Sequence, residues 1–268
     1  MAKLSFRIFA VILFISFTLP LCTCGLDVYE GNMLHPPYGS GNATDEDEPL
    51  TRVFKFTTAE SYESPYLSQS NSNNSYITFN GTIVYYKIYN SLTAMNNERS
   101  YISSANSQYS SSGALKAIDL GYKQLKCYSW NIKANQMRSD YYSLPDSKHD
   151  RSVTIRLFTE GDVNDPYQAG FYVGETDPKT DAQGNIIIPW RNAGSKEKDF
   201  DFFDDDGVED PPEDVDDDYL FSAETSYDDV EEGQFYVAAY AASYGTNYYL
   251  TTVYSQLLPL GYVIIKDK

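Results

Sequence analysis

The chain has 268 residues, of which 42% are hydrophobic, so it is long enough to form one large β-domain or two small ones around a core. Its formal net charge of −18 excludes nucleic acid as an expected partner, because a phosphate backbone requires a basic surface. The same charge favours cations or basic surfaces as partners, or serves solubility alone.

The first 24 residues have the pattern of a secretory signal peptide. Lys3 and Arg7 precede the apolar run Ile8–Leu21, and two cysteines follow it closely. The run is too short for a comfortable membrane span. Residues 1–24 are therefore predicted to be a signal peptide, and the protein is predicted to be exported.

Cys24 is a candidate lipidation site. The sequence Leu21-Cys22-Thr23-Cys24-Gly25 resembles a bacterial lipobox, although Thr23 departs from the Gly, Ala or Ser that usually precedes the lipidated cysteine. Lipidation of Cys24 would anchor the protein in a membrane. The alternative is ordinary cleavage near this point, which would leave the cysteine unmodified and the protein secreted.

Residues 25–50 contain Pro36-Pro37, four glycines and a run of four acidic residues, a composition that predicts a flexible tether. Residues 51–268 are predicted to form a single domain. The remaining cysteine, Cys127, is predicted to be a small buried hydrophobic residue on a strand.

Two distant segments, Gly81–Tyr89 and Phe235–Tyr244, are rich in aromatic, β-branched and small residues. These types suit a pleated, half-buried surface, so the two segments are predicted to be companion strands at the centre of the fold. Asn80-Gly81 is a turn signal, which predicts a bend between a short preceding strand and Gly81–Tyr89. The other predicted strands are Arg52–Thr57, Tyr76–Phe79, Tyr122–Trp130, Ser152–Phe158, Phe171–Val173, Ile186–Trp190, Tyr248–Tyr254 and Gly261–Lys266.

In the predicted strand Ser152–Phe158, Val153, Ile155 and Leu157 are expected to face the core and Thr154 and Arg156 to face solvent. The segments Phe171–Val173 and Ile186–Trp190 resemble two arms around a polar turn region. Residues 131–150 are predicted to be a loop.

A short helix is predicted over Leu92–Ala105, where Leu92, Met95, Arg99 and Ile102 recur at helical spacing and Asn90-Ser91 can cap the start. Ala114–Leu120 is predicted to add a helical turn.

About nine strands at short spacing predict an all-β fold, an antiparallel β-sandwich of the immunoglobulin or fibronectin type III-like kind with a short helical insertion. Residues 194–233 interrupt this pattern. Within Glu197–Asp218, acidic residues are dense and Lys198 is the only basic one. Like charges at this density repel one another, so the segment is predicted to be a solvated acidic loop outside the sandwich.

Asp204, Asp206 and Asp210 are candidate calcium ligands, since the first two precede Gly207 at a spacing similar to that of an EF-hand loop. The match fails at the first ligand position, which is Phe202, and a solvated loop without metal is the favoured alternative. Phe200, Phe202 and Phe203 are candidate binding aromatics, which would dock either on the domain itself or on a partner.

The segments Tyr85–Tyr89 and Tyr236–Tyr240 resemble strands of a fibronectin type III-like or immunoglobulin-like sandwich. Together with the lipobox-like start, the chain resembles exported lipoproteins of spirochaetal (treponemal) bacteria, many of unknown function. The resemblance implies a non-enzymatic protein of the cell envelope, periplasmic or at the surface, that presents a β-sandwich for binding or structural support to a protein or glycan partner.

Two alternatives stay open. One is a secreted binding module whose acidic loop holds calcium or a basic partner. The other is a carbohydrate-active protein, for which the many acidic residues supply candidate carboxylate pairs. The sequence has no Gly-x-Ser-x-Gly elbow and no glycine-rich phosphate loop.

Overall fold

The computed structural model describes residues 34–39, 52–59, 77–107, 110–131, 136–141, 144, 149–162, 165–174, 177–194, 198–202, 210–223, 230, 233–247 and 249–266. All of them lie in one compact unit, Met33–Lys268. The predicted signal peptide, Cys24 and most of the predicted tether lie outside the described residues.

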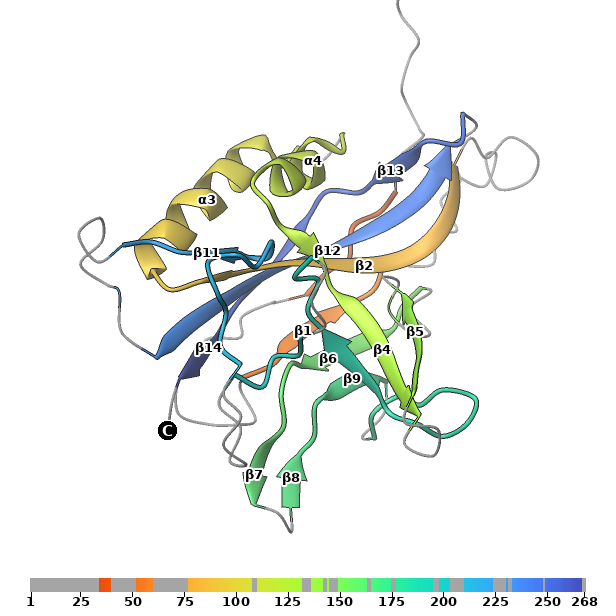
Figure 1. Cartoon of the computed structure of the whole chain (residues 1–268). Helices are drawn as coiled ribbons and strands as arrows, with labels where there is room; N and C mark the ends of the chain where they lie inside the picture. The colour runs from red at the N-terminus through yellow and green to blue at the C-terminus, as the bar shows by residue number, and fades with distance from the viewer. Residues whose placement is uncertain are drawn as a thin grey trace, which may run out of the picture. The chain divides into compact units, whose positions relative to one another are not determined.

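The described residues form fourteen strands and two helices, so the fold is mostly β-sheet (Figure 1). The helices are α3 (Leu92–Ala105) and α4 (Ser112–Asp119). Neither of these two helices is long and apolar enough to cross a membrane.

The largest sheet has six strands and is built around the pairing of β2 (Ile77–Tyr89) with β12 (Gln234–Asn247). The two strands run antiparallel, with Tyr89 opposite Tyr236 at one end and Ile77 opposite Asn247 at the other. This confirms that the two aromatic segments are companion strands. The sheet is completed by β3 (Lys123–Gln124), β11 (Tyr219–Leu220), β13 (Thr252–Tyr254) and β14 (Leu258–Lys266).

A β-bulge interrupts this central pair at Asn80-Gly81, where the sequence predicted a bend. Tyr244 is opposite Gly81 and Gly245 is opposite Phe79, so Asn80 is the extra residue of β2. Gly81 has φ 142°, a conformation that side chains with a Cβ rarely adopt. Gly245 is constrained by close approach, because a Cβ there would clash with the carbonyl oxygen of Thr78.

Three smaller sheets accompany the large one. The first contains β1 (Phe54–Thr57), β6 (Ser152–Arg156) and β9 (Gly170–Val173). The second contains β10 (Ile187–Trp190), β4 (Lys126–Asn131) and β5 (Gln136–Tyr141). The third is the hairpin of β7 (Glu160–Asp162) and β8 (Asp165–Tyr167).

Several expectations about these elements were wrong. Strands β9 and β10, expected as two arms around one turn, pair in different sheets, and β5 lies within the segment expected to be a loop. Arg156, expected to face solvent, is only 6% exposed. Strand β11 runs parallel to β2, whereas all the other pairings among the described strands are antiparallel.

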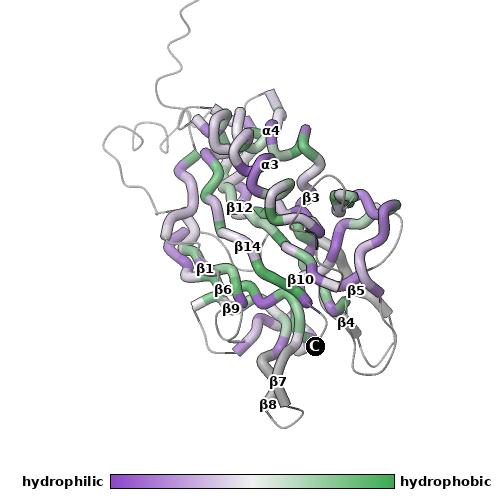
Figure 2. The backbone as a smooth tube through the Cα atoms, turned by 90° about the vertical axis from the view of Figure 1, so that its left-hand side faces the viewer, coloured by the Kyte–Doolittle hydropathy of each residue, from purple (hydrophilic) through white to green (hydrophobic). Residues whose placement is uncertain are grey.

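The two faces of β2 and β12 contact different partners. One face carries Val84, Tyr86 and Ile88 and shares a core with β1, β6 and β9. The other carries Ile83, Tyr85 and Tyr89 and shares a core with the two helices. Both faces are therefore buried, which explains why neither face of these strands is purely polar (Figure 2, in which β12 and β14 carry long hydrophobic stretches).

Helix α3 matches its predicted range and its predicted cap. The side chain of Ser91 accepts a hydrogen bond from the backbone N–H of Ala94 at 3.1 Å, and Met95 and Ile102 are buried. Cys127 is also as predicted, since it lies fully buried on β4 as a free thiol.

Candidate functional site

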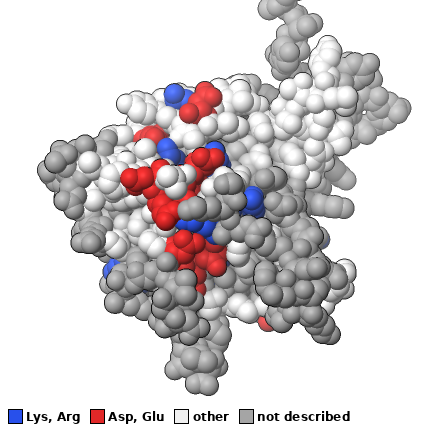
Figure 3. Space-filling model, viewed as in Figure 1, with Lys and Arg blue, Asp and Glu red and all other residues white. Residues whose placement is uncertain are grey.

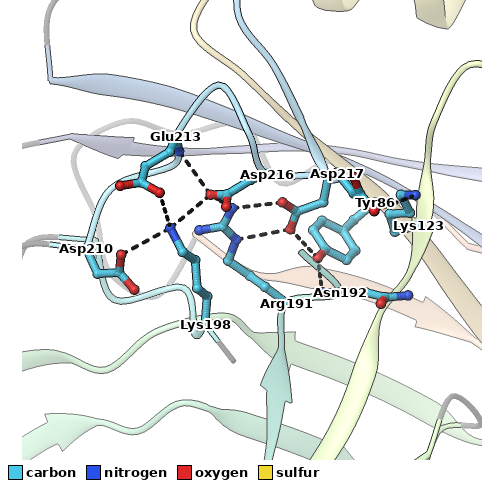
Figure 4. Close-up of polar contacts among 10 residues, drawn as sticks. Tyr86, Lys123, Arg191, Asn192, Lys198, Asp210, Glu213, Asp216 and Asp217 are labelled. Atoms are coloured by element: carbon cyan, nitrogen blue, oxygen red, sulfur yellow. Dashed lines mark hydrogen bonds and ion pairs between the residues drawn. The ribbon is translucent and has the colours of Figure 1, made fainter. Parts of the chain in front are cut away.

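One group of charged side chains lies in the interior, and we call it the buried ion-pair network. It consists of Arg191, Lys198, Asp216, Asp218 and the hydroxyl of Tyr86 (Figure 4). Each of the five residues is at most 3% exposed in the fold.

Arg191 is the centre of the network and directly follows β10. Its Nε donates to Oδ2 of Asp218 at 3.0 Å, and its Nη2 donates to Oδ1 of Asp218 at 2.8 Å. The same Nη2 donates to Oδ2 of Asp216 at 2.9 Å. The guanidinium therefore holds one aspartate with two parallel bonds and a second with one, the geometry in which arginine binds carboxylates most strongly.

Tyr86 connects this group to the central strand. Its hydroxyl donates to Oδ2 of Asp218 at 2.5 Å and accepts a hydrogen bond from the backbone N–H of Asn192 at 2.5 Å. The backbone N–H of Ile88 in turn donates to the carbonyl oxygen of Asp218 at 2.9 Å. We call Glu197–Asp218 the acidic segment. Strand β2, the residues that follow β10 and the end of the acidic segment are thus joined at one point.

Lys198 forms the outer half of the network. Its Nζ lies 3.0 Å from Oδ2 of Asp216 and 3.1 Å from Oδ1 of Asp210, and 3.6 Å from Oε2 of Glu213. Its carbonyl oxygen accepts from the backbone N–H of Arg191 at 3.0 Å. Three carboxylates therefore converge on one ammonium group.

The charges of the network balance, because two buried cations face the two buried carboxylates of Asp216 and Asp218. Burial alone would raise the pKa of Asp216, but the backbone N–H of Glu213 and the two cations outweigh it, so the pKa lies below its ordinary value. Burial likewise opposes the charge of Lys198, yet its carboxylate neighbours leave its pKa raised. Burial and the negative charge of Asp218 raise the pKa of Tyr86 well above its usual range, so this hydroxyl stays protonated.

Aromatic rings shield the network from water. The ring of Phe200 contacts that of Tyr86 edge to face at 5.1 Å, and the guanidinium of Arg191 lies 5.5 Å from the ring centre of Phe202. Phe202 also packs against Phe235 of β12. These candidate binding aromatics were expected to dock either on the domain or on a partner. Both Phe200 and Phe202 are fully buried in the domain itself. Phe203 lies outside the described residues.

The prediction that the acidic segment lies outside the fold was wrong for its last part. Asp216 and Asp218 are 3% and 0% exposed, although they belong to a run of three aspartates. A turn just before β11, in which the backbone N–H of Tyr219 donates to the carbonyl oxygen of Asp216 at 3.2 Å, lets neighbouring side chains face opposite ways. Asp217 points outward with 61% of its side chain exposed.

The candidate calcium ligands are only partly described. Asp204 and Asp206 lie outside the described residues, and Asp210 is half exposed with its carboxylate on Lys198. Among the residues that the structure describes, no three His, Cys, Asp or Glu side chains are grouped so that they could hold a metal ion. The ammonium of Lys198 occupies the point on which Asp210, Glu213 and Asp216 converge.

Sequence reasoning missed Arg191 and both buried aspartates. The one available signal was Lys198, a lone basic residue within a strongly acidic run. A second polar contact was also missed, in which Nζ of Lys87 on β2 bonds Glu98 of α3 at 2.8 Å and the carbonyl oxygen of Leu120 at 2.6 Å. This contact fastens the helix layer to the sheet.

The buried ion-pair network holds the acidic segment against the core and leaves a row of outer carboxylates at the surface. Asp210, Glu213 and Asp217 have side chains 51%, 52% and 61% exposed. Figure 3 shows acidic side chains gathered in the middle of this face. Comparisons of the chain with protein-family models, with curated proteins and with solved structures gave no match.

Proposed function

We propose that the protein is a non-enzymatic, exported component of the cell envelope, anchored by a lipid on Cys24 and presenting its β-domain for binding or structural support. The observation that carries the proposal is that the buried charged side chains form ion pairs within the fold. Asp216 and Asp218 both bond Arg191, and these ion pairs hold the acidic segment on the domain. The basic start and apolar run of residues 1–24 support export. The resemblance to spirochaetal lipoproteins rests on the lipobox-like start together with the strand segments Tyr85–Tyr89 and Tyr236–Tyr240.

Metabolic labelling with a radioactive fatty acid tests the anchor. The wild-type chain and a Cys22→Ala variant are expected to carry label, and a Cys24→Ala variant is expected to carry none. Cys22→Ala is the matched control, because it changes the neighbouring cysteine and keeps the lipobox-like Leu21 and Gly25. Absence of label from the wild-type chain, or its persistence in Cys24→Ala, would remove the anchor from the proposal.

A second candidate is a binding module whose acidic segment takes calcium or a basic partner. It is favoured by the exposed carboxylates of Asp210 and Glu213, which lie beside Lys198, and of Asp217, which lies 3.8 Å from Lys123. A cation that bound there would compete with Lys198 for two of these carboxylates.

Calorimetric titration with calcium and with oligolysine tests this candidate. The variant to compare is the triple substitution Asp210→Asn, Glu213→Gln and Asp217→Asn, which removes outer charge and keeps Asp216 and Asp218. Deleting the segment would be a poor control, since it would also remove the buried ion pairs. Identical heats for the wild type and the triple variant with both ligands would end this candidate.

We further propose that the large sheet and the β1–β6–β9 sheet form a β-sandwich of the immunoglobulin or fibronectin type III-like kind. Their facing residues, among them Val84 and Ile88 on one side and Phe54 and Ile155 on the other, belong to one core cluster. An experimental structure would test this, since an aligned sandwich keeps the strand directions of its two sheets within about 30°.

A further inference from the structure

The strand pair β12–β13 ends in a tight turn that presents two large side chains to solvent. Tyr249 is 82% exposed and Leu250 is 86% exposed. The turn is firmly built, because the side chain of Asn247 accepts from the backbone N–H groups of Tyr249 at 3.0 Å and Thr251 at 2.9 Å. We call Tyr249 and Leu250 the hairpin tip.

Leu250 is an unusual residue for its position. Its φ of 60° lies in the left-handed region, where Gly and Asn are common and a bulky apolar residue is a rare exception. The left-handed backbone costs free energy at this position, and the exposure of an apolar side chain to water gains none. Backbone strain of this kind is often found where a side chain has a function.

The chain around the tip carries no charge over an exceptional length. Gly233–Ile265 and Ser64–Tyr86 contain no Asp, Glu, Lys, Arg or His, in a protein in which 22% of residues are charged. In the fold these stretches meet, since Ile77–Val84 pairs with Ala241–Asn247. A third uncharged stretch, Ser100–Leu115, contacts them through Ser111, whose side chain donates to the carbonyl oxygen of Tyr254 at 3.1 Å.

The acidic segment and the hairpin tip lie at opposite ends of β2. The acidic segment joins β2 where Tyr219 and Leu220 pair with Ile88 and Tyr89, whereas the tip follows the pairing of Asn247 with Ile77. The separation along the strand is on the order of 40 Å. This is several Debye lengths at physiological salt, so the acidic segment does not repel an anionic surface from the tip. In Figure 3 the described atoms at the upper right, where Figure 1 places β13 and the end of β12, are white.

The N-terminal part of the chain enters the compact unit at this same end. The side chain of Ser243 on β12 donates to the carbonyl oxygen of His35 at 2.6 Å, and Ser243 is four residues before Asn247. The 33 residues that precede Leu34 include the apolar run and Cys24. A lipid anchor on those residues would therefore be connected to the domain close to the hairpin tip.

We infer that the hairpin tip inserts into the interfacial layer of the lipid membrane to which the chain is anchored. The inference rests on the proposed membrane anchor and names the surface that the domain turns towards it. Leu250 would enter the acyl boundary, and Tyr249, with an apolar ring and a polar hydroxyl, suits the headgroup level. A stable protein interface buries about 800 Å² on each partner, which a two-residue tip does not supply, whereas lipid requires only apolar side chains that can enter it.

Tryptophan quenching in vesicles tests the inference on the full exported chain. The variants are Leu250→Trp and, as a matched control at the acidic end, Val215→Trp, since Val215 is likewise apolar and 74% exposed. Trp130 and Trp190 are present in both variants and in the wild type, so their signal is subtracted. The vesicles are phosphatidylcholine with brominated acyl chains, which quench only tryptophans that reach the lipid.

We expect the fluorescence added by Leu250→Trp to shift to shorter wavelength and to be quenched, while the fluorescence added by Val215→Trp stays as in water. Equal, unquenched signals from both introduced tryptophans in protein that sediments with the vesicles would overturn the inference and leave the anchor intact. A shift in the Leu250→Trp variant that grows with protein concentration in the absence of lipid would also overturn it, since it would mean that the tip binds a second copy.

A Cys24→Ser background separates the tip from the anchor. In that background Leu250→Asp is expected to lower the partition coefficient into phosphatidylcholine vesicles by about tenfold or more, because the burial of one leucine side chain is lost. Val215→Asp adds the same charge at the far end and should leave partitioning unchanged. If the fluorescence of Leu250→Trp is still quenched in the Cys24→Ser background, this would support insertion of the hairpin tip. That result would stand even if fatty acid labelling had shown that Cys24 carries no lipid. Equal partitioning of the two aspartate variants would overturn the inference.

Discussion

Asp217 and Asp218 are neighbours in the chain and have opposite surroundings. Asp217 is 61% exposed and lies 3.8 Å from Lys123, whereas the side chain of Asp218 is fully buried against Arg191 and Tyr86. Surface ion pairs contribute little to stability because water screens them. A buried carboxylate that holds a buried guanidinium is different, since its loss leaves an uncompensated charge in the interior.

Asp218→Asn is therefore expected to lower the free energy of unfolding by about 3–5 kcal/mol. Asp217→Asn, the same change one residue away, is expected to alter it by at most about 0.5 kcal/mol. Urea unfolding followed by circular dichroism measures both. Equal effects of the two substitutions would mean that Arg191 does not depend on Asp218.

At Leu250 the expected change has the opposite sign. Leu250→Asn places a residue that tolerates positive φ at a position where the leucine makes few contacts, so the free energy of unfolding should rise by about 1 kcal/mol. Val215→Asn, also an exposed apolar position, lacks this strain and should change little. If urea unfolding shows no gain for Leu250→Asn, the backbone there is not strained.

At the scale of elements, the molecule is organised by one pair of long strands whose two faces differ in what covers them. Tyr86 faces the buried ion-pair network, and its neighbours Tyr85 and Lys87 face the helices. The alternation of a single strand thus connects the helix layer to the acidic segment. Helix α3 depends on this arrangement at its start, because its cap, Ser91, follows β2 by only two residues.

Ser91→Ala is expected to lower the free energy of unfolding by about 1 kcal/mol, because the backbone N–H of Ala94 would lose its acceptor. Ser100→Ala in the same helix is the control. Ser100 is exposed in the helix interior, where alanine is the better helix former, so its replacement should be neutral or slightly stabilising. Thermal unfolding of both variants checks the difference, and a loss at Ser100 as large as that at Ser91 would contradict the role of the cap.

At the scale of the whole molecule, the described end of the acidic segment and the hairpin tip lie at opposite ends of β2. The acidic segment docks at one end of β2, and the other end meets long uncharged stretches. Balanced charge in the interior is stable only while its members keep their ionisation states. The stability of the whole fold is therefore expected to depend on pH through the network.

The pKa of Asp216 is below its ordinary value of 3.8 in the fold, so the unfolded chain binds a proton first as pH falls. Its stabilisation is fully present above pH 3.8 and is lost as pH falls further. The pKa of Lys198 is raised from 10.5 and that of Tyr86 from 10.0, so their contributions are present below these values and are lost as pH rises above them. We expect a plateau of the unfolding free energy between about pH 5 and 9, with declines on both sides.

Urea unfolding over a pH series tests this dependence. Asp216→Asn should be less stable on the plateau and should show a shallower acid decline than the wild type. An acid decline of unchanged slope in Asp216→Asn would assign the effect to other carboxylates. Asp217→Asn serves again as the control and should follow the wild-type profile.

Much of the fold could be predicted because local pattern and tertiary environment agree. The run Gly81–Tyr89 has apolar residues on both faces, which is what a strand covered on both sides requires, and Ser91 stands where a helix cap is needed. Prediction failed at Arg156, which is buried although its type and its place in the alternation indicate solvent. It also failed for β9 and β10, because two nearby strands can pair with each other or with other sheets, and nothing local to them decides which.

The sequence by itself determined the β-rich class, the two long central strands, a bend at Asn80-Gly81 and the capped helix, since each depends on residues within one turn or one alternating run. Only the tertiary structure decided which aspartates of the run Asp216–Asp218 are inside, because three identical residues carry no polarity pattern. That choice depends on Arg191, 25 residues earlier, and on Tyr86, 132 residues before Asp218. Buried charge is specified by partners that distant segments supply, and no local pattern contains them.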